Sequence, residues 1–179
     1  MGAPEEAFGQ QALALLRQLD TACANAEDLA DAATERFARH PDAAIITSMP
    51  GLAELTGARV LAEIGDDRDR FADARGLEAY AGSAPVTRAS GKPPPSCIGG
   101  NQRLTSVGYV WAFAALTASP GTRAHYDRRK NAGDRHVAAH ATLFNRLLGC
   151  LHHCLHTRQT HDEAIALPTT SNTADAPAA

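Results

Sequence analysis

The chain has 179 residues, of which 44% are hydrophobic and 21% charged, and its formal net charge is −3. This length and apolar content fit one domain with a core, or one domain with an appended helix. The longest apolar runs fall short of the roughly eighteen residues that a membrane helix needs, which argues against a membrane protein. The start, MGAPEEAFGQ, does not resemble a signal peptide, and four irregularly spaced cysteines do not suggest a disulfide framework. We therefore expect a cytoplasmic protein.

Charge is distributed unevenly along the sequence. Residues 1–67 contain four Arg against twelve Asp or Glu, a net charge of −8. Residues 68–158 contain thirteen Lys or Arg against five acids, a net charge of +8. The basic residues 68–158 indicate that only this part of the chain binds phosphates. A solvated charged surface would have the same composition.

Residues 4–40 are predicted to form one long helix, which ends at His40-Pro41 because a proline steers the preceding residue out of the helical region. The helix can pair with another copy, which predicts a homo-oligomer, or it can lie on its own domain. Its apolar residues recur in alternating steps of four and three, the period of a coiled-coil seam: Phe8, Ala12, Leu15, Leu19, Ala22, Ala26, Leu29 and Ala33.

Residues 43–52, which contain a Pro-Gly turn, and residues 56–64, which have helical spacing, are predicted to form two short helices around that turn. This arrangement resembles a helix-hairpin-helix module, whose glycine-rich turn offers backbone N–H groups to DNA phosphates without reading sequence. Gly51 is the phosphate contact in that interpretation. Ala53 stands where such hairpins usually have a second glycine, so an ordinary helical turn is an equal alternative.

Segment 80–103 is rich in Gly, Pro and Ser and lies between two helical patterns. Gly and Pro interrupt helices and central strands, and irregular segments between rigid elements often carry binding or catalytic groups. At its centre Ser90 precedes Gly91, with Arg88 and Lys92 on either side. The cations could hold a phosphate where the Ser90 hydroxyl attacks it, and Gly91 would let the substrate approach the backbone. The alternative is a solvated linker whose serine makes turn hydrogen bonds.

Residues 102–118 have apolar side chains at helical spacing, with Asn101 as the predicted N-cap and Trp111 and Tyr109 expected in the core. Ser119-Pro120-Gly121 ends this helix, and a last helix is predicted over residues 136–155. Between them lies the densest basic cluster of the chain, which could contact the DNA backbone or form a solvated face. Its members are Arg123, Tyr126, Arg128, Arg129 and Lys130, and Arg135 continues the same surface.

The last helix also carries histidines and cysteines, among them His136, His140, Cys150 and Cys154. Structural zinc sites usually take ligand pairs separated by two to four residues on two different elements, and the histidine pair lacks the glutamate of a zinc-hydrolase helix. We therefore expect no metal site in this chain. Residues 159–179, which end in Pro, Thr, Ser and Ala, are expected to be a disordered tail.

Five pieces occur in order: PGLAELTGARVLAEIGDDRDRF, LEAYAGSAP, RASGK, GGNQRL, and the stretch from WAFAALTASPG to FNRLL. From about residue 45 to about residue 155, they resemble the C-terminal domain of the insertion-sequence transposases of the one-ten, one-sixteen and nine-oh-two group. The long helix stands where that family has its coiled coil. Two departures are Thr105, where the family usually has an arginine, and the stiff Pro93–Pro95 run.

Full-length members of that family are RNA-guided DNA recombinases. The resemblance implies that Ser90 attacks a DNA phosphodiester and forms a transient phosphoserine link. A serine hydroxyl needs a base or a metal to activate it, and the family's metal is held by four acidic residues of an N-terminal RuvC-like domain. No such pattern precedes the long helix, so magnesium is expected in a missing domain and this chain alone is expected to be inactive. The implied partners are DNA, a guide RNA and a second copy, at a bacterial nucleoid.

The sequence thus predicts an all-α protein: a coiled-coil-like helix over residues 4–40, a serine-bearing transposase domain with a helix-hairpin-helix-like element over 43–158, and a tail over 159–179. Ser90 is the catalytic candidate. Two alternatives remain: a non-enzymatic DNA-binding or dimerisation remnant, and a helical scaffold that binds no nucleic acid. The nucleic-acid contacts predicted are Gly51, Arg88, Gly91, Lys92, Asn101, Arg103, Arg123, Tyr126, Arg128, Arg129, Lys130 and Arg135.

Overall fold

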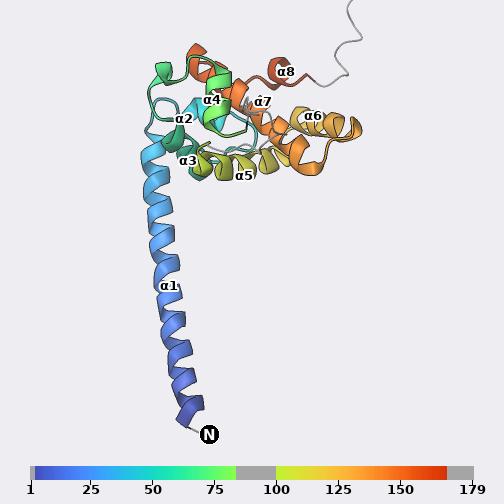
Figure 1. Ribbon diagram of the computed structural model, residues 1–179. Coiled ribbons are helices and arrows are strands. Elements are labelled where there is room, and N and C mark those ends of the chain that lie inside the picture. Colours follow the sequence, from blue (N-terminus) through green and yellow to red (C-terminus); the bar gives the residue numbers. More distant parts are fainter. Residues whose placement is uncertain (1–2, 84–99, 169–179) are drawn as a thin grey trace, which may run out of the picture.

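The structure is a computed structural model, and it describes residues 3–83 and 100–168 (Figure 1). Within these ranges all regular structure is helical, so the predicted all-α fold is confirmed. None of the helices described is long and apolar enough to cross a membrane. The helices are α1 (Ala3–Ala38), α2 (Ala43–Thr47), α3 (Glu54–Ile64), the 3-10 turn η1 (Arg68–Arg70), α4 (Ala74–Tyr80), α5 (Gln102–Ala118), α6 (Pro120–Asn131), α7 (His136–Thr157) and α8 (Glu163–Ala166).

Helix α1 extends away from the body as a single rod, while α2 to α8 gather at its C-terminal end (Figure 1). It contacts the body only near that end, against α2 and α3. Four apolar seam residues are each more than half exposed: Phe8, Leu15, Leu19 and Leu29. The expectation that this helix lies on its own domain is therefore wrong for most of its length. Pairing with another copy stays a prediction.

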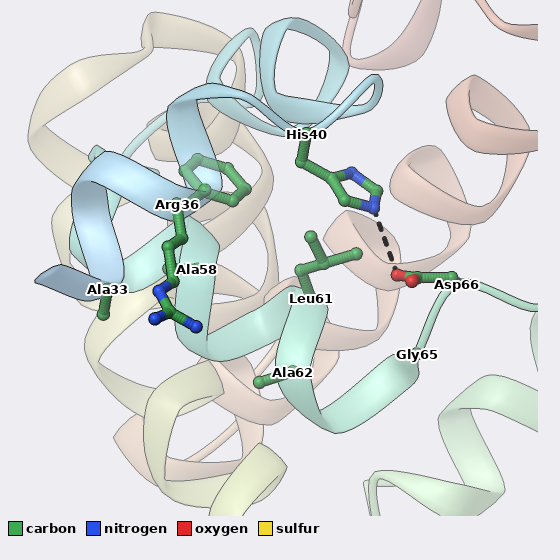
Figure 2. A pocket seen from close by; sticks show the side chains of 9 residues that line it. Ala33, Arg36, His40, Ala58, Leu61, Ala62, Gly65 and Asp66 are labelled. Carbon is green, nitrogen blue, oxygen red and sulfur yellow. Dashed lines mark ion pairs between the residues drawn. The ribbon is translucent and has the colours of Figure 1, made fainter.

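The end of α1 is fixed to the body by Phe37 and by the polar contacts of His40. Phe37 is buried, and an open groove lies between this end of α1 and α3 (Figure 2). At the rim of the groove, His40 Nε2 lies 3.2 Å from an Asp66 oxygen, and Nδ1 accepts the Asp42 N–H at 3.2 Å. The buried Asp42 carboxylate also pairs with Arg68. These contacts set the direction in which α1 leaves the body.

The core lies between α5 and α7, which pack against each other, and α2, α3 and α4, which pack against these two helices. Trp111 of α5 is fully buried, as predicted, meets the Phe144 ring edge-on and donates its indole N–H to the Pro50 carbonyl at 2.9 Å. Tyr109, on the same helix, was expected beside it. That prediction is wrong, because 49% of Tyr109 is exposed.

The segment after α7 folds back over the body. The Glu163 carboxylate accepts the Ser119 hydroxyl at 2.6 Å and the Gly121 N–H at 2.7 Å, while Leu167 is buried against Gly121. Arg146 of α7 donates to the Ala166 carbonyl. The disorder expected from residue 159 onward is thus wrong for residues 159–168. These contacts stabilise the N-terminus of α6, where a carboxylate is favoured by the exposed N–H groups and the helix dipole.

Candidate nucleic-acid interface

The two ends of the Gly/Pro-rich segment meet at one point of the fold. Gly82, which has a positive φ of 70°, packs against Gly100 so closely that a Cβ on Gly100 would lie 2.2 Å from the Gly82 Cα. The Asn101 N–H donates to the Tyr80 carbonyl at 2.7 Å. The described residues just before and just after residues 84–99 therefore lie at adjacent positions. Four predicted site residues lie outside the described residues: Arg88, Ser90, Gly91 and Lys92.

Side chains from α3, α4, α5 and α7 hold this meeting point, which we call the segment base. Asn101 donates its amide to Glu63 Oε2 at 2.6 Å and to the Tyr80 hydroxyl at 2.8 Å. Thr105 donates to the Ala81 carbonyl at 2.6 Å, and Asn145 of α7 donates to the Ser83 carbonyl at 3.2 Å. The Thr105 and Asn145 bonds fix backbone carbonyls that precede residues 84–99, and the two Asn101 bonds join side chains.

Asn101 was predicted both as the N-cap of α5 and as a nucleic-acid contact. Its Oδ1 accepts the N–H groups of Arg103 and Leu104 at 2.9 and 3.1 Å, so the cap is confirmed. Because its amide nitrogen is also used by Glu63 and Tyr80, the structure gives Asn101 a structural role. Arg103 is exposed in the first turn of α5, where its guanidinium can reach a phosphate.

The Pro-Gly turn between α2 and α3 faces the protein interior on one side. Gly51 has a φ of 78°, and a Cβ added to it would lie 2.4 Å from the backbone nitrogen of Ala115 in α5. The turn needs glycine for this close approach of two backbones. A helix-hairpin-helix geometry does not follow from these contacts, and the phosphate contact of Gly51 stays a prediction.

Helix α6 carries most of the basic cluster, but part of its charge is neutralised locally. Arg123 Nε donates to Asp127 at 2.9 Å, and this hydrogen bond and charge raise the pKa of Arg123. Arg129 pairs with Asp134 at 2.6 Å, and Lys130 donates to the carbonyl of that residue at 3.0 Å. The sequence alone did not indicate this pairing, although both acids stand within five residues of their partners.

Within the described ranges, Arg128 and Arg135 are the cations of this surface that contact neither a carboxylate nor a backbone carbonyl. Both are exposed, Arg128 in the last turn of α6 and Arg135 just before α7. Tyr126 is partly buried, and its hydroxyl lies 2.7 Å from His136 Nδ1. The α6 surface is defined here as Arg123, Tyr126, Arg128, Arg129, Lys130 and Arg135. It can thus offer Arg128 and Arg135 to a phosphate backbone without breaking a contact made within the described ranges.

The described residues do not contain three or more His, Cys, Asp or Glu side chains placed to hold one metal ion. Cys150 and Cys154 are buried on α7, and burial raises the pKa of both thiols. A neutral buried thiol is a poor metal ligand. This part of the chain therefore does not fit the divalent metal that the family resemblance implies.

Comparison with known proteins decides the family. Residues 43–127, which include α2 to α5 and most of α6, match the model of the family described as Transposase IS116/IS110/IS902. These residues form a transposase domain of that family. The match includes the Pro-Gly turn, the segment base except Asn145, and the start of the α6 surface.

Relatives agree with this assignment. The chain is 59% identical over 165 residues to a Streptomyces coelicolor protein described as a mini-circle transposase for IS117. It is 38% identical over 148 residues to an uncharacterised 42 kDa protein of insertion element IS900 from Mycobacterium paratuberculosis. These alignments use 90% and 78% of this chain. The chain spans only 39% and 35% of the length of the two relatives.

Proposed function

We propose that this chain is the serine-bearing, DNA-engaging part of an insertion-sequence transposase that acts at the bacterial nucleoid. The observation that carries the proposal is the segment base within the transposase domain. It fixes both ends of a segment in which Ser90 is flanked by Arg88 and Lys92. A catalytic hydroxyl needs this kind of support from rigid elements.

The chemistry proposed is transfer of a DNA phosphoryl group to Ser90. The Ser90 oxygen attacks the phosphorus, the bond from phosphorus to one DNA oxygen breaks, and that oxygen leaves as a hydroxyl after taking up a proton. Attack by a DNA hydroxyl on the phosphoserine reverses these steps and rejoins a strand. Arg88 and Lys92 would stabilise the negative charge that develops on the phosphoryl oxygens.

A divalent ion, when bound, would act as a Lewis acid that activates the attacking hydroxyl and stabilises the leaving oxygen. Because the described residues do not fit such a site, we expect the ion on a RuvC-like domain. We propose that the chain by itself leaves DNA uncut, and that a guide RNA and the metal-binding domain belong to the complete complex.

DNA engagement is tested by the salt dependence of duplex binding. Fluorescence anisotropy with a labelled duplex should show an affinity that falls linearly with salt on a log–log plot. Replacing Arg128 or Arg135 by Gln should each reduce the slope by about one, since each contributes one phosphate contact. Arg17→Gln on α1 is the matched control and should leave the slope unchanged. An absence of binding at low salt would show that the DNA role is wrong, and unchanged slopes in both variants would exclude the α6 surface.

The exposed seam of α1 supports a second proposal, pairing of α1 with the α1 of another copy. Leu19→Lys should weaken self-association about a hundredfold or more, because two leucines per dimer would lose their apolar contacts and two charges would face each other. Gln10→Lys, off the seam on the same helix, is the control. Sedimentation equilibrium measures both variants. A monomeric wild-type chain at every concentration would contradict the pairing.

A further inference from the structure

A row of four rings, which we call the ring row, crosses three helices beside the α6 surface. Tyr109 of α5 packs against His140 of α7 with ring centroids 4.4 Å apart and ring planes tilted by 36°, and His136 follows one turn earlier on α7 at 5.8 Å. His136 meets Tyr126 of α6 edge-on at 5.8 Å and is hydrogen-bonded to its hydroxyl. The ring row therefore joins the exposed face of α5 to the basic surface.

The α5 end of the ring row is open to solvent. Tyr109 is 49% exposed, and its neighbours Val110 and Phe113 on the same helix face are 54% and 59% exposed. A single exposed apolar side chain needs no explanation, but a contiguous patch with two aromatic rings is typical of a binding surface.

The His140 ring of α7 packs against the Tyr109 ring on the side that faces the protein. It is only 2% exposed, and its Nε2 has no hydrogen-bond partner in the part of the chain that the structure describes. Burial and the neighbouring His136 lower the pKa of His140, so the imidazole is neutral at pH 7. With this neutral, buried ring packed against it at a tilt of 36°, Tyr109 is held in place while 49% of it stays exposed to a ligand.

The charges around the ring row favour nucleic acid over a protein partner. Helix α5 has no acidic residue along its length, and Arg103 is exposed on the same helix stripe as Val110 and Phe113. Arg128 and Arg135 lie at the other end of the row. Aromatic rings bordered by cations suit unpaired nucleotides, since every base has a face that stacks on a ring and every linkage carries a negative charge.

We propose that the ring row binds unpaired nucleotides of a single DNA or RNA strand, with a base stacked on Tyr109. This inference rests on the proposed DNA-engaging function and deepens it. The cations bind phosphates of a duplex and of a single strand alike, whereas base pairs inside a duplex are already stacked on one another. The ring row would thus give the protein a preference for unpaired strands over duplex DNA.

The test compares three labelled probes with the full chain by fluorescence anisotropy: a single DNA strand of about 15 nucleotides, an RNA strand of that length, and the matching DNA duplex. Tyr109→Ala should weaken single-strand binding about five- to a hundredfold and change duplex binding less than about twofold. Tyr109→Phe keeps the ring and should bind like the wild type. Leu13→Ala, at an exposed apolar position of α1 outside the seam, is the control. The DNA and RNA probes show which strand the row prefers.

Two outcomes would overturn the inference while leaving the proposed function intact. In the first, the chain binds the duplex, and Tyr109→Ala leaves its single-strand binding unchanged. The other is Tyr109→Ala reducing self-association in sedimentation with no effect on nucleic-acid binding, which would make this face a protein interface. A chain that binds none of the three probes would refute the proposed function itself. Thermal unfolding by circular dichroism confirms that each variant is folded.

Discussion

Replacing Gly51 by Ala is expected to destabilise the protein by about 2–5 kcal/mol, a large share of the roughly 5–15 kcal/mol that holds a domain of this kind together. Two costs add. An alanine in the left-handed region costs about 1–2 kcal/mol, and Gly51 has a φ of 78°. Its new Cβ would also lie 2.4 Å from the Ala115 nitrogen, and forcing atoms into a packed interior costs about 1–3 kcal/mol or more.

Urea unfolding followed by circular dichroism measures this loss, with Gly9→Ala as the matched control. Gly9 lies in α1, where an added Cβ would meet no atom within 4 Å. Alanine there should be neutral or stabilise by about 0.5–1 kcal/mol, as expected for an exposed helical position. A Gly51→Ala protein that is as stable as the wild type but binds duplex DNA poorly would show that the turn faces phosphate instead of α5.

The sequence was sufficient for the elements whose signals are local. The Pro-terminated α1, the Asn101 cap of α5 and the break at Ser119-Pro120-Gly121 all occur where expected, because each depends on neighbouring residues only. Helical spacing also placed Trp111 in the core correctly.

The exposure of Tyr109 could not be predicted because α5 is apolar on nearly all sides. Four large apolar residues stand close together in this helix: Tyr109, Val110, Trp111 and Phe113. Their spacing does not show which side of α5 packs against α7. That choice depends on how the helices pack. The ring row needs three helices to meet, so no stretch of sequence contains its signal.

Long-range polar contacts explain the other differences. The segment after α7 looked like a tail by composition, yet Glu163 caps α6 from 42 positions further along the chain. Asn101 similarly joins Glu63 and Tyr80, which lie on two earlier helices. Such partners can be recognised only after the fold has brought them together.

Ser90→Ala is expected to abolish strand cleavage and strand joining by the complete transposase, while duplex binding by the chain stays within about twofold of the wild type. The loss should be total, because an alanine methyl group cannot form a phosphoester. Ser83→Ala is the matched control: Ser83 lies at the segment base, and its hydroxyl donates to the Glu78 carbonyl. It should keep activity.

The most direct test is to look for the covalent link itself. The chain is combined with the RuvC-like metal-binding domain that we propose completes it, magnesium, the guide RNA and a nicked DNA substrate. The trapped protein–DNA adduct is then digested and sequenced by mass spectrometry. We expect a phosphodiester-linked nucleotide on Ser90, with none formed when the metal-binding domain is omitted. An adduct on another residue, or strand transfer that proceeds unchanged in Ser90→Ala, would contradict it.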